Sequence, residues 1–194
     1  MKMPKGNRGF TLIELLVVVA IISLLVSILM PSLAKVKLLA GNAKCLSNLK
    51  QHYMAFTYYA QDHNDRVMTP GPPTYDYRPD LYPYLDADKN NRRSQDVTTC
   101  PLADFEGAYH KSYGINGPMR GARTIEKVLT RYPGGDRYIV WADGIGKHRL
   151  EDTTYLDWRH PGENGVCNLA MLSGNIKAVH QGEGGYGIGT KSWK

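Results

Sequence analysis

The chain has 194 residues, enough for one apolar segment and one domain of ordinary size. Its formal net charge is +6, but Lys2, Lys5 and Arg8 supply half of that charge, and the later cations are interspersed with Asp and Glu. This distribution offers no concentrated basic face, which argues against nucleic-acid binding.

The first long element is an apolar run from Phe10 to Met30, in which Glu14 is the one charged residue. As a helix this run spans about 31 Å, the thickness of a bilayer core. A carboxylate at mid-bilayer costs on the order of 2.5–3.5 kcal/mol, so Glu14 needs a partner, and the run itself is expected to offer none. The cations before the run predict a cytoplasmic N-terminus and an exported C-terminal part.

Three interpretations of this run are open. An ordinary secretory signal needs a shorter apolar core of about 7–15 residues, followed by a small-residue cleavage site. A plain single-pass anchor accounts for the length but leaves Glu14 unexplained. The third interpretation rests on Gly9-Phe10-Thr11-Leu12-Ile13-Glu14, which follows a basic leader and opens the apolar run. This stretch resembles the cleavage and methylation motif of type IV pilin and type II secretion pseudopilin precursors.

The resemblance implies that prepilin peptidase cuts between Gly9 and Phe10 and that the new amino terminus of Phe10 is methylated. It also implies that Glu14 pairs with the N-terminal amine of a neighbouring subunit in a helix bundle, and that Pro31 kinks the helix. The implied function is structural and not enzymatic: a subunit of a type II secretion or type IV pilus-like fibre.

The implied partners are other pilin-like subunits, prepilin peptidase and an inner-membrane assembly platform. The implied location is the bacterial inner membrane, crossed once, with the C-terminal domain in the periplasm. After assembly the subunit would lie in a periplasmic pseudopilus or a cell-surface fibre.

Four segments are predicted: a leader that is removed (1–9), a transmembrane assembly helix (10–30), its amphipathic continuation (31–62) and an exported globular domain (63–194). Pro31 lacks an amide donor, but good helix formers follow it at once, so it should bend the helix without ending it.

Beyond Gly41 the helix becomes amphipathic, and polar residues such as Asn48 are expected largely away from the apolar face. That face is formed by residues at three- and four-residue steps, namely Cys45, Leu49, Tyr53, Phe56 and Ala60. The outer half of the helix should therefore pack on a globular core.

Strand-like runs follow late in the chain, at Tyr138–Ala142, 166–172 and 175–180. The last two flank a Ser-Gly turn and predict a C-terminal β-hairpin. The fold class expected is α+β and pilin-like, with a long N-terminal helix packed on a small antiparallel β-sheet with long loops.

A second resemblance concerns the domain. The stretches Cys45-Leu-Ser-Asn48-Leu-Lys-Gln51, Cys100-Pro101 and Ser112-Tyr-Gly-Ile-Asn116 resemble a branch of pseudopilin-like proteins that is abundant in planctomycetes. Arg159-His160 is similar to the C-terminal signature of that branch. The signature has diverged here, because Ser173-Gly174-Asn175 replaces its Asp-Gly-His.

Cys45, Cys100 and Cys167 lack the CxxC spacing of a zinc site, so no zinc site is expected. In an exported domain, one disulfide with one thiol left over is the natural arrangement. The resemblance implies Cys45 and Cys100 as the pair, which would add about 3–4 kcal/mol by closing a long loop. Two unpaired thiols are the alternative. Cys167 lies in an apolar strand-like run and is predicted to be buried.

A catalytic interpretation would pair His160, as a base, with Asp157 or Asp143, and would use Ser173 as the nucleophile. The chain has no nucleophile elbow, no H-E-x-x-H and no phosphate loop. Arg159 and His160 are expected instead to hydrogen-bond loop backbone beside the hairpin, so no enzyme activity is predicted.

No cofactor is predicted. Calcium, which pseudopilins of the major type bind in a terminal loop, has only weak candidate ligands here: Asp143, Asp152 and Asp157. An alternative function is a pilin-anchored exported protein that binds a ligand or carbohydrate, with the tyrosine-rich segment 75–84 stacking on its partner.

Overall fold

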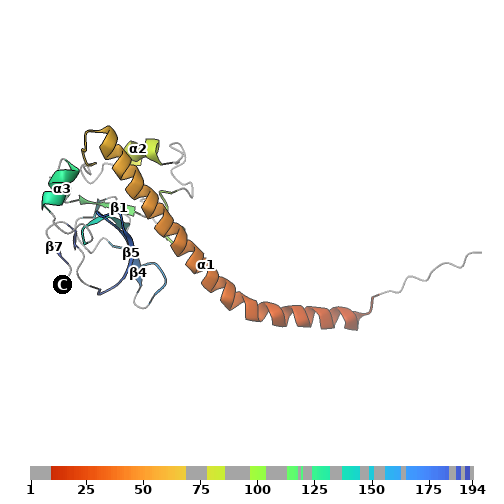
Figure 1. Cartoon of the computed structure of the whole chain (residues 1–194). Helices are drawn as coiled ribbons and strands as arrows, with labels where there is room; N and C mark the ends of the chain where they lie inside the picture. Colours follow the sequence, from red (N-terminus) through yellow and green to blue (C-terminus); the bar gives the residue numbers. More distant parts are fainter. Residues whose placement is uncertain are drawn as a thin grey trace, which may run out of the picture. The chain divides into compact units, whose positions relative to one another are not determined.

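The computed structural model describes residues 10–68, 78–85, 97–103, 113–117, 119, 124–131, 137–144, 149–150, 156–162, 165–183, 187–188 and 191–192. The chain divides into two compact units, Met1–Lys37 and Leu38–Lys194. Figure 1 shows the elements of the chain in sequence order.

The longest element is the helix α1, Leu12–Asp62. Its length follows from a run of apolar and helix-forming residues with no Gly before Gly41. Pro31 lies inside α1 without ending it, as predicted. The kink expected at Pro31 stays a prediction.

Polar residues end α1 at Asp62. The backbone beyond it turns through Asn64 and Asp65, whose φ angles are 55° and 58°. Asn and Asp tolerate this left-handed region better than other residues with a Cβ atom. The turn lets the amide of Asp65 donate to the carbonyl of Ala60 at 2.7 Å, which satisfies a carbonyl group at the helix end.

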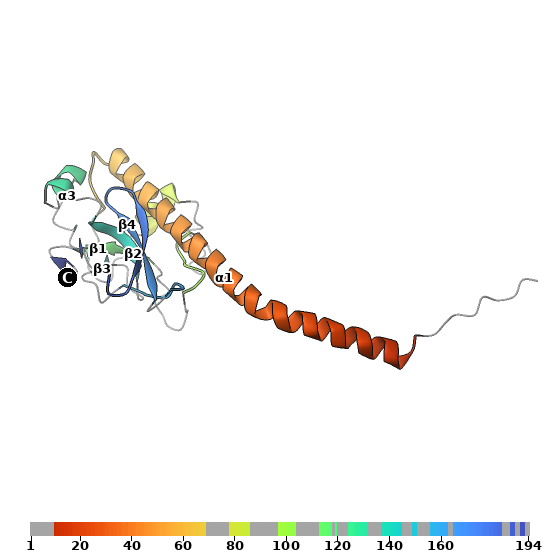
Figure 2. The ribbon, with the colours of Figure 1, turned by 60° about the horizontal axis from the view of Figure 1, so that its bottom comes forward.

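The outer half of α1 lies along one face of the β-sheet in the second unit (Figures 1 and 2). The ring of His52 lies 5.0 Å from that of Trp141 and 5.1 Å from that of Tyr113, and both of these residues belong to the sheet. This packing confirms the predicted α+β arrangement of a long helix on a small sheet. The buried residues of α1 recur every three or four positions: Cys45, Asn48, Leu49, His52, Ala55, Phe56 and Ala60.

The sheet has five strands in the order β3-β1-β2-β4-β5. All neighbouring pairs are antiparallel except β1 and β3, which are parallel. The four antiparallel strands therefore match the prediction, and the two-residue β3 extends the sheet at one edge. The strands are β1 (Tyr113–Asn116), β2 (Ile139–Asp143), β3 (Arg149–Leu150), β4 (Val166–Met171) and β5 (Ile176–His180).

Both faces of the sheet are covered. The larger apolar cluster joins α1 to one face and includes Phe56, Ile115 and Trp141. A smaller cluster includes Leu150, Leu156, side chains from alternate positions of β4, and Ile139 and Ala142 of β2, between which the pairing of β2 with β4 shifts register. This double coverage explains why every residue of β2 and β4 is buried.

The β4–β5 hairpin contacts α1 at its turn. Gly174 has a φ of +85°, and a Cβ atom there would lie 3.0 Å from the ring of Tyr53. The hydroxyl of Tyr53 donates to the carbonyl of Leu172 at 3.0 Å, and Lys50 Nζ donates to the carbonyl of Gly174 at 3.0 Å. Glycine therefore allows both the backbone turn and the close approach of the helix.

Five shorter elements complete the described structure: α2 (Arg78–Leu81), a 3₁₀ helix η1 (Tyr82–Tyr84), α3 (Ile125–Arg131) and the paired strands β6 (Gly187–Ile188) and β7 (Lys191–Ser192). The hydroxyl of Tyr84 donates to Asp62 Oδ2 at 2.8 Å, and its ring packs edge-on against Tyr59. Tyr84 thus ties η1 to the end of α1.

Candidate functional site

The first candidate site is the beginning of α1. Gly9 lies outside the described residues, and Phe10 is the first residue that the structure describes. The amide and the hydroxyl of Thr11 donate to Glu14 Oε2 at 2.9 and 2.8 Å, and the amide of Glu14 donates to Thr11 Oγ1 at 3.3 Å. This is a capping box, in which two residues three positions apart satisfy each other's amides. It fixes the start of α1.

The capping box corrects one expectation. The apolar run was predicted to offer Glu14 no partner, but Thr11 hydrogen-bonds its carboxylate. The partner is a neutral donor three residues away and not an opposite charge. Thr11 carries no charge, and no described residue forms an ion pair with Glu14.

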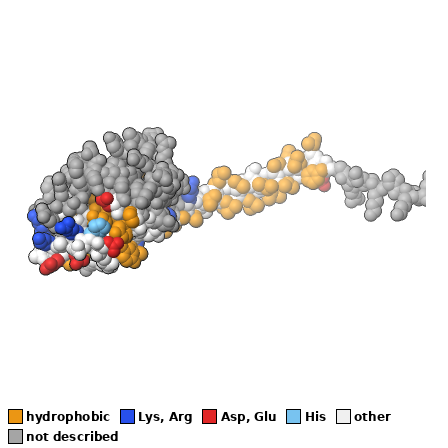
Figure 3. Space-filling view, turned by 90° about the horizontal axis from the view of Figure 1, so that it is seen from above, with side chains coloured by type: hydrophobic (Ala, Val, Ile, Leu, Met, Phe, Trp, Pro, Cys, Tyr) orange, Lys and Arg blue, Asp and Glu red, His pale blue; other side chains and the backbone are white. Residues whose placement is uncertain are grey.

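The apolar segment that follows is exposed on all sides. The side chains of Leu12, Ile13 and Leu16 are 85%, 76% and 67% exposed, and hydrophobic side chains line the face of α1 seen in Figure 3. This segment is long and apolar enough to cross a membrane. Its exposure indicates that it functions in an apolar environment and not in water.

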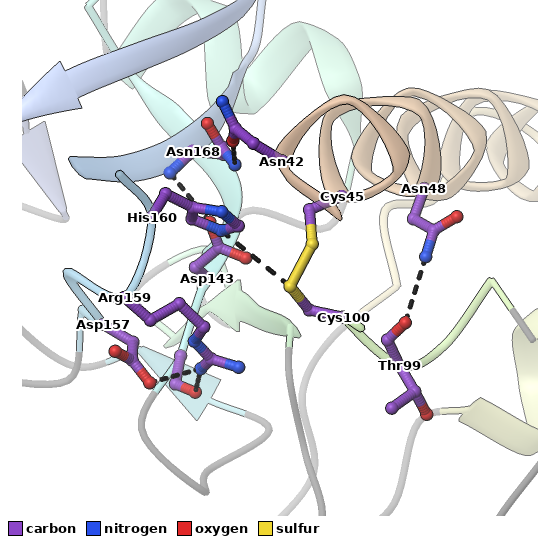
Figure 4. Close-up of a disulfide and its surroundings, with 11 residues drawn as sticks. Asn42, Cys45, Asn48, Thr99, Cys100, Asp143, Asp157, Arg159, His160 and Asn168 are labelled. Atoms are coloured by element: carbon purple, nitrogen blue, oxygen red, sulfur yellow. Dashed lines mark hydrogen bonds and ion pairs between the residues drawn. A yellow bond between two sulfur atoms is a disulfide. The ribbon is translucent and has the colours of Figure 1, made fainter. Parts of the chain in front are cut away.

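The second candidate site is a buried polar centre beside the disulfide Cys45–Cys100 (Figure 4). The disulfide joins α1 to the segment that leads into Pro101 and was the pair implied by the resemblance. Two hydrogen bonds hold the same segment along the helix: Asn48 Nδ2 donates to the carbonyl of Thr99 at 3.1 Å, and His52 Nε2 lies 3.0 Å from the carbonyl of Val97.

Next to the disulfide, His160 pairs with Asp143. The two side chains are fully buried, and His160 Nε2 lies 2.8 Å from Asp143 Oδ2. Asp143 Oδ2 also accepts the amide of Asn168 at 2.8 Å. His160 Nε2 lies 3.9 Å from the Sγ atom of Cys100. The centre thus combines a carboxylate, an imidazole and two sulfur atoms in a space closed to water.

The structure distinguishes between the two candidate partners of His160. Asp143 contacts His160, whereas Asp157 forms an ion pair with Arg159. Arg159 also donates to the carbonyl of Gly144 at 2.8 Å, as expected for a residue that binds loop backbone. The side chain of His160 differs from this expectation, because it binds a carboxylate.

The candidate catalytic residues do not form a site that a substrate could enter. His160 and Asp143 are fully buried, while Ser173 is exposed in the turn between β4 and β5. Two of the candidate calcium ligands already have other partners. Asp143 pairs with the imidazole of His160, and Asp157 pairs with Arg159. Asp152 and residues 75–77 of the tyrosine-rich segment lie outside the described residues.

Buried asparagines were missed by the sequence analysis. Asn48 was expected away from the apolar face of α1, but it is completely buried. Asn168 Nδ2 donates to Asn42 Oδ1 at 2.9 Å and so links β4 to the helix. The signal for Asn48 was its spacing: it follows Cys45 by three residues and therefore lies on the same helix face.

Cys167 is free and buried, as predicted. Burial raises the pKa of its thiol, and the nearby charges of Asp143 and Asp157 raise that pKa further. Burial also raises the pKa of Tyr113, with a smaller contribution from Asp143. These groups therefore stay protonated in the folded domain at neutral pH.

Comparison with known proteins identifies one part of the chain. Residues 4–30 match the family described as the prokaryotic N-terminal methylation motif. This match confirms the resemblance of the N-terminal segment to type IV pilin and pseudopilin-like precursors and supports anchoring in a membrane. No curated protein and no solved structure matches the chain.

Proposed function

We propose that this protein is a structural subunit of a type II secretion or type IV pilus-like fibre. Its precursor is cut between Gly9 and Phe10 by prepilin peptidase, methylated on Phe10 and assembled through α1. The observation that carries this proposal is the methylation motif at residues 4–30, followed directly by an exposed apolar helix.

Glu14 favours assembly of α1 with the helices of neighbouring subunits. Its charge is costly in a bilayer, and no described residue forms an ion pair with it. The amine of Phe10, freed by cleavage, would supply that charge on a neighbouring subunit. The capping box leaves room for this role, because it uses Oε2 and no described residue hydrogen-bonds Oε1.

The disulfide of the domain supports the proposal that the domain is exported from the cytoplasm. A disulfide such as Cys45–Cys100 persists in oxidising compartments outside the cytoplasm. With the leader in the cytoplasm, α1 crosses the inner membrane and the domain lies in the periplasm. In the fibre the domain forms the outer surface, and its neighbours are other pilin-like subunits placed by the assembly platform.

The test is the mass of the chain extracted from membranes of cells that contain an active prepilin peptidase. We expect the loss of residues 1–9 and the gain of one methyl group on Phe10. A Gly9→Val variant, which blocks a cleavage site that depends on a small residue, should keep the intact leader. An unprocessed wild-type chain in such cells would contradict the proposal.

A further inference from the structure

The buried centre of the domain gathers three side chains that can all bind Zn²⁺, with a carboxylate beside them. The Sγ atoms of Cys45 and Cys100 and a ring nitrogen of His160 lie within 4.8 Å of one another. Asp143 Oδ2 lies 2.8 Å from His160 Nε2. All four residues are buried, and they come from four separate parts of the chain.

We propose that the chain with reduced cysteines binds one Zn²⁺ ion through Cys45, Cys100 and His160, with the carboxylate of Asp143 beside the imidazole of His160. Tetrahedral Zn²⁺ holds sulfur at about 2.3 Å and nitrogen or oxygen at about 2.0 Å, which places the donor atoms roughly 3.3–3.8 Å apart. The distance of 3.9 Å between Cys100 Sγ and His160 Nε2 is already close to this range.

Unsatisfied polar atoms at the centre favour a ligand. Asp143 Oδ1 is buried without a hydrogen-bond partner among the described residues. Such an atom destabilises the folded state unless something binds it. The amide of Asn168 meanwhile holds Oδ2 at 2.8 Å and fixes the orientation of the carboxylate. Figure 4 shows Asp143 and His160 on the same side of the disulfide.

The Cys45–Cys100 disulfide and a bound Zn²⁺ ion exclude each other, because both use the same two sulfur atoms. When Zn²⁺ binds, the two thiols lose two protons and become thiolate ligands. An oxidised dithiol protein, acting as the oxidant, would take two electrons from the thiolates and form the Cys45–Cys100 bond. It would take up two protons to become a dithiol, and Zn²⁺ would be released.

The spacing rule that argued against zinc does not apply to this arrangement. It covers ligands that are close in sequence, whereas Cys45 and Cys100 are 55 residues apart and His160 follows Cys100 by 60. The fold, and not a local motif, brings these ligands together.

The test uses the full-length chain in detergent micelles. The chain is reduced with a phosphine, freed of reductant and metal without air, and titrated with Zn²⁺ against a chromophoric chelator. We expect one Zn²⁺ per reduced chain and none per oxidised chain. Co²⁺, as a spectroscopic probe, should give the visible bands of a tetrahedral complex and thiolate-to-metal charge-transfer bands.

Variants locate the site. Cys100→Ser and His160→Gln should each weaken binding at least about 10-fold, and Asp143→Asn by about 10- to 100-fold. Cys167→Ser is the matched control, because it removes a buried thiol outside the cluster and should leave binding unchanged. His160→Gln and Asp143→Asn retain both cysteines, so their fold is verified by circular dichroism in the oxidised state before reduction.

Three results would overturn the proposal. The reduced chain could bind no more metal than the oxidised chain, or Cys167→Ser could weaken binding as much as Cys100→Ser. Unchanged binding in His160→Gln would show that the thiolates hold the metal without the folded centre, for example in an unfolded chain.

Discussion

Glu14 combines two roles that substitutions can separate. Its carboxylate closes the capping box with Thr11, which stabilises the first turn of α1. Its negative charge is a different property, and in the proposed fibre this charge attracts the amine of Phe10 on a neighbour. Glutamine retains the acceptor oxygen of the capping box but has no charge.

We therefore predict that Glu14→Gln and Glu14→Ala both abolish assembly into filaments, while the leader is still removed. The physical reason is that the amine needs an opposite charge and not merely an acceptor. Assembly is measured by recovery of sheared filaments, and processing by mass. Filament yields for Glu14→Gln close to those of wild type would show that the capping box alone matters.

Two buried groups predict how stability depends on pH. The pKa values of Cys167 and Tyr113 are raised in the folded chain. In the unfolded chain the two groups have their ordinary pKa values of about 8.5 and 10, so the unfolded chain loses these protons at lower pH than the folded chain. Between the unfolded and folded pKa values the native state binds more protons, so the free energy of unfolding falls as pH rises.

Each group should contribute about 1.4 kcal/mol of lost stability per pH unit in its window, which begins near pH 9 for Cys167 and near pH 10 for Tyr113. Urea unfolding from pH 7 to 11 measures the decline. Cys167→Ala and Tyr113→Phe should each make the decline shallower. An unchanged slope in both variants would contradict this account.

At the scale of elements, the disulfide ties the outer half of α1 to the segment at Cys100. We predict that Cys45→Ala with Cys100→Ala lowers the free energy of unfolding by about 4 kcal/mol, the loop-closure value for a separation of 55 residues. Urea unfolding of the oxidised chains measures the loss, with chelator present. The control is Cys167→Ala, which leaves the disulfide intact. A double variant as stable as this control would refute the prediction.

Pro31 sets the path of the proposed membrane helix. Its ring removes one hydrogen bond and clashes with the preceding turn, so we predict a kink there. Spin labels at Ser27→Cys and Lys37→Cys report the distance across this turn. Pro31→Ala should lengthen the mean distance toward the value of a straight helix, about 15 Å between the backbones. An equal distance in both chains would mean that Pro31 does not bend α1.

At the scale of the whole molecule, the two compact units are suited to different surroundings. The described part of the unit Met1–Lys37, from Phe10 onward, presents apolar side chains outward, whereas Leu38–Lys194 encloses apolar clusters on both faces of its sheet. The first is stable when a bilayer or a bundle of similar helices covers it, and the second is stable in water. A fibre subunit requires both properties in one chain.

Local patterns predicted much of this molecule. The apolar run and the three- and four-residue steps of α1 depend on neighbours in sequence, and the hairpin β4–β5 depends on a short turn. The burial of Asn48 was predicted wrongly, because its partner is the carbonyl of Thr99, far away in sequence. A polar residue on an apolar face is satisfied only when the fold supplies such a partner.

The sequence by itself determined the N-terminal motif, the length of α1, the apolar face of its outer half and the presence of a terminal hairpin. The tertiary structure decided that Asp143, and not Asp157, is the partner of His160, and that His160 lies against the Cys45–Cys100 disulfide. The physical reason is sequence distance. The first set of features is governed by helix and turn geometry over a few residues, whereas the buried centre exists only after four distant segments pack together.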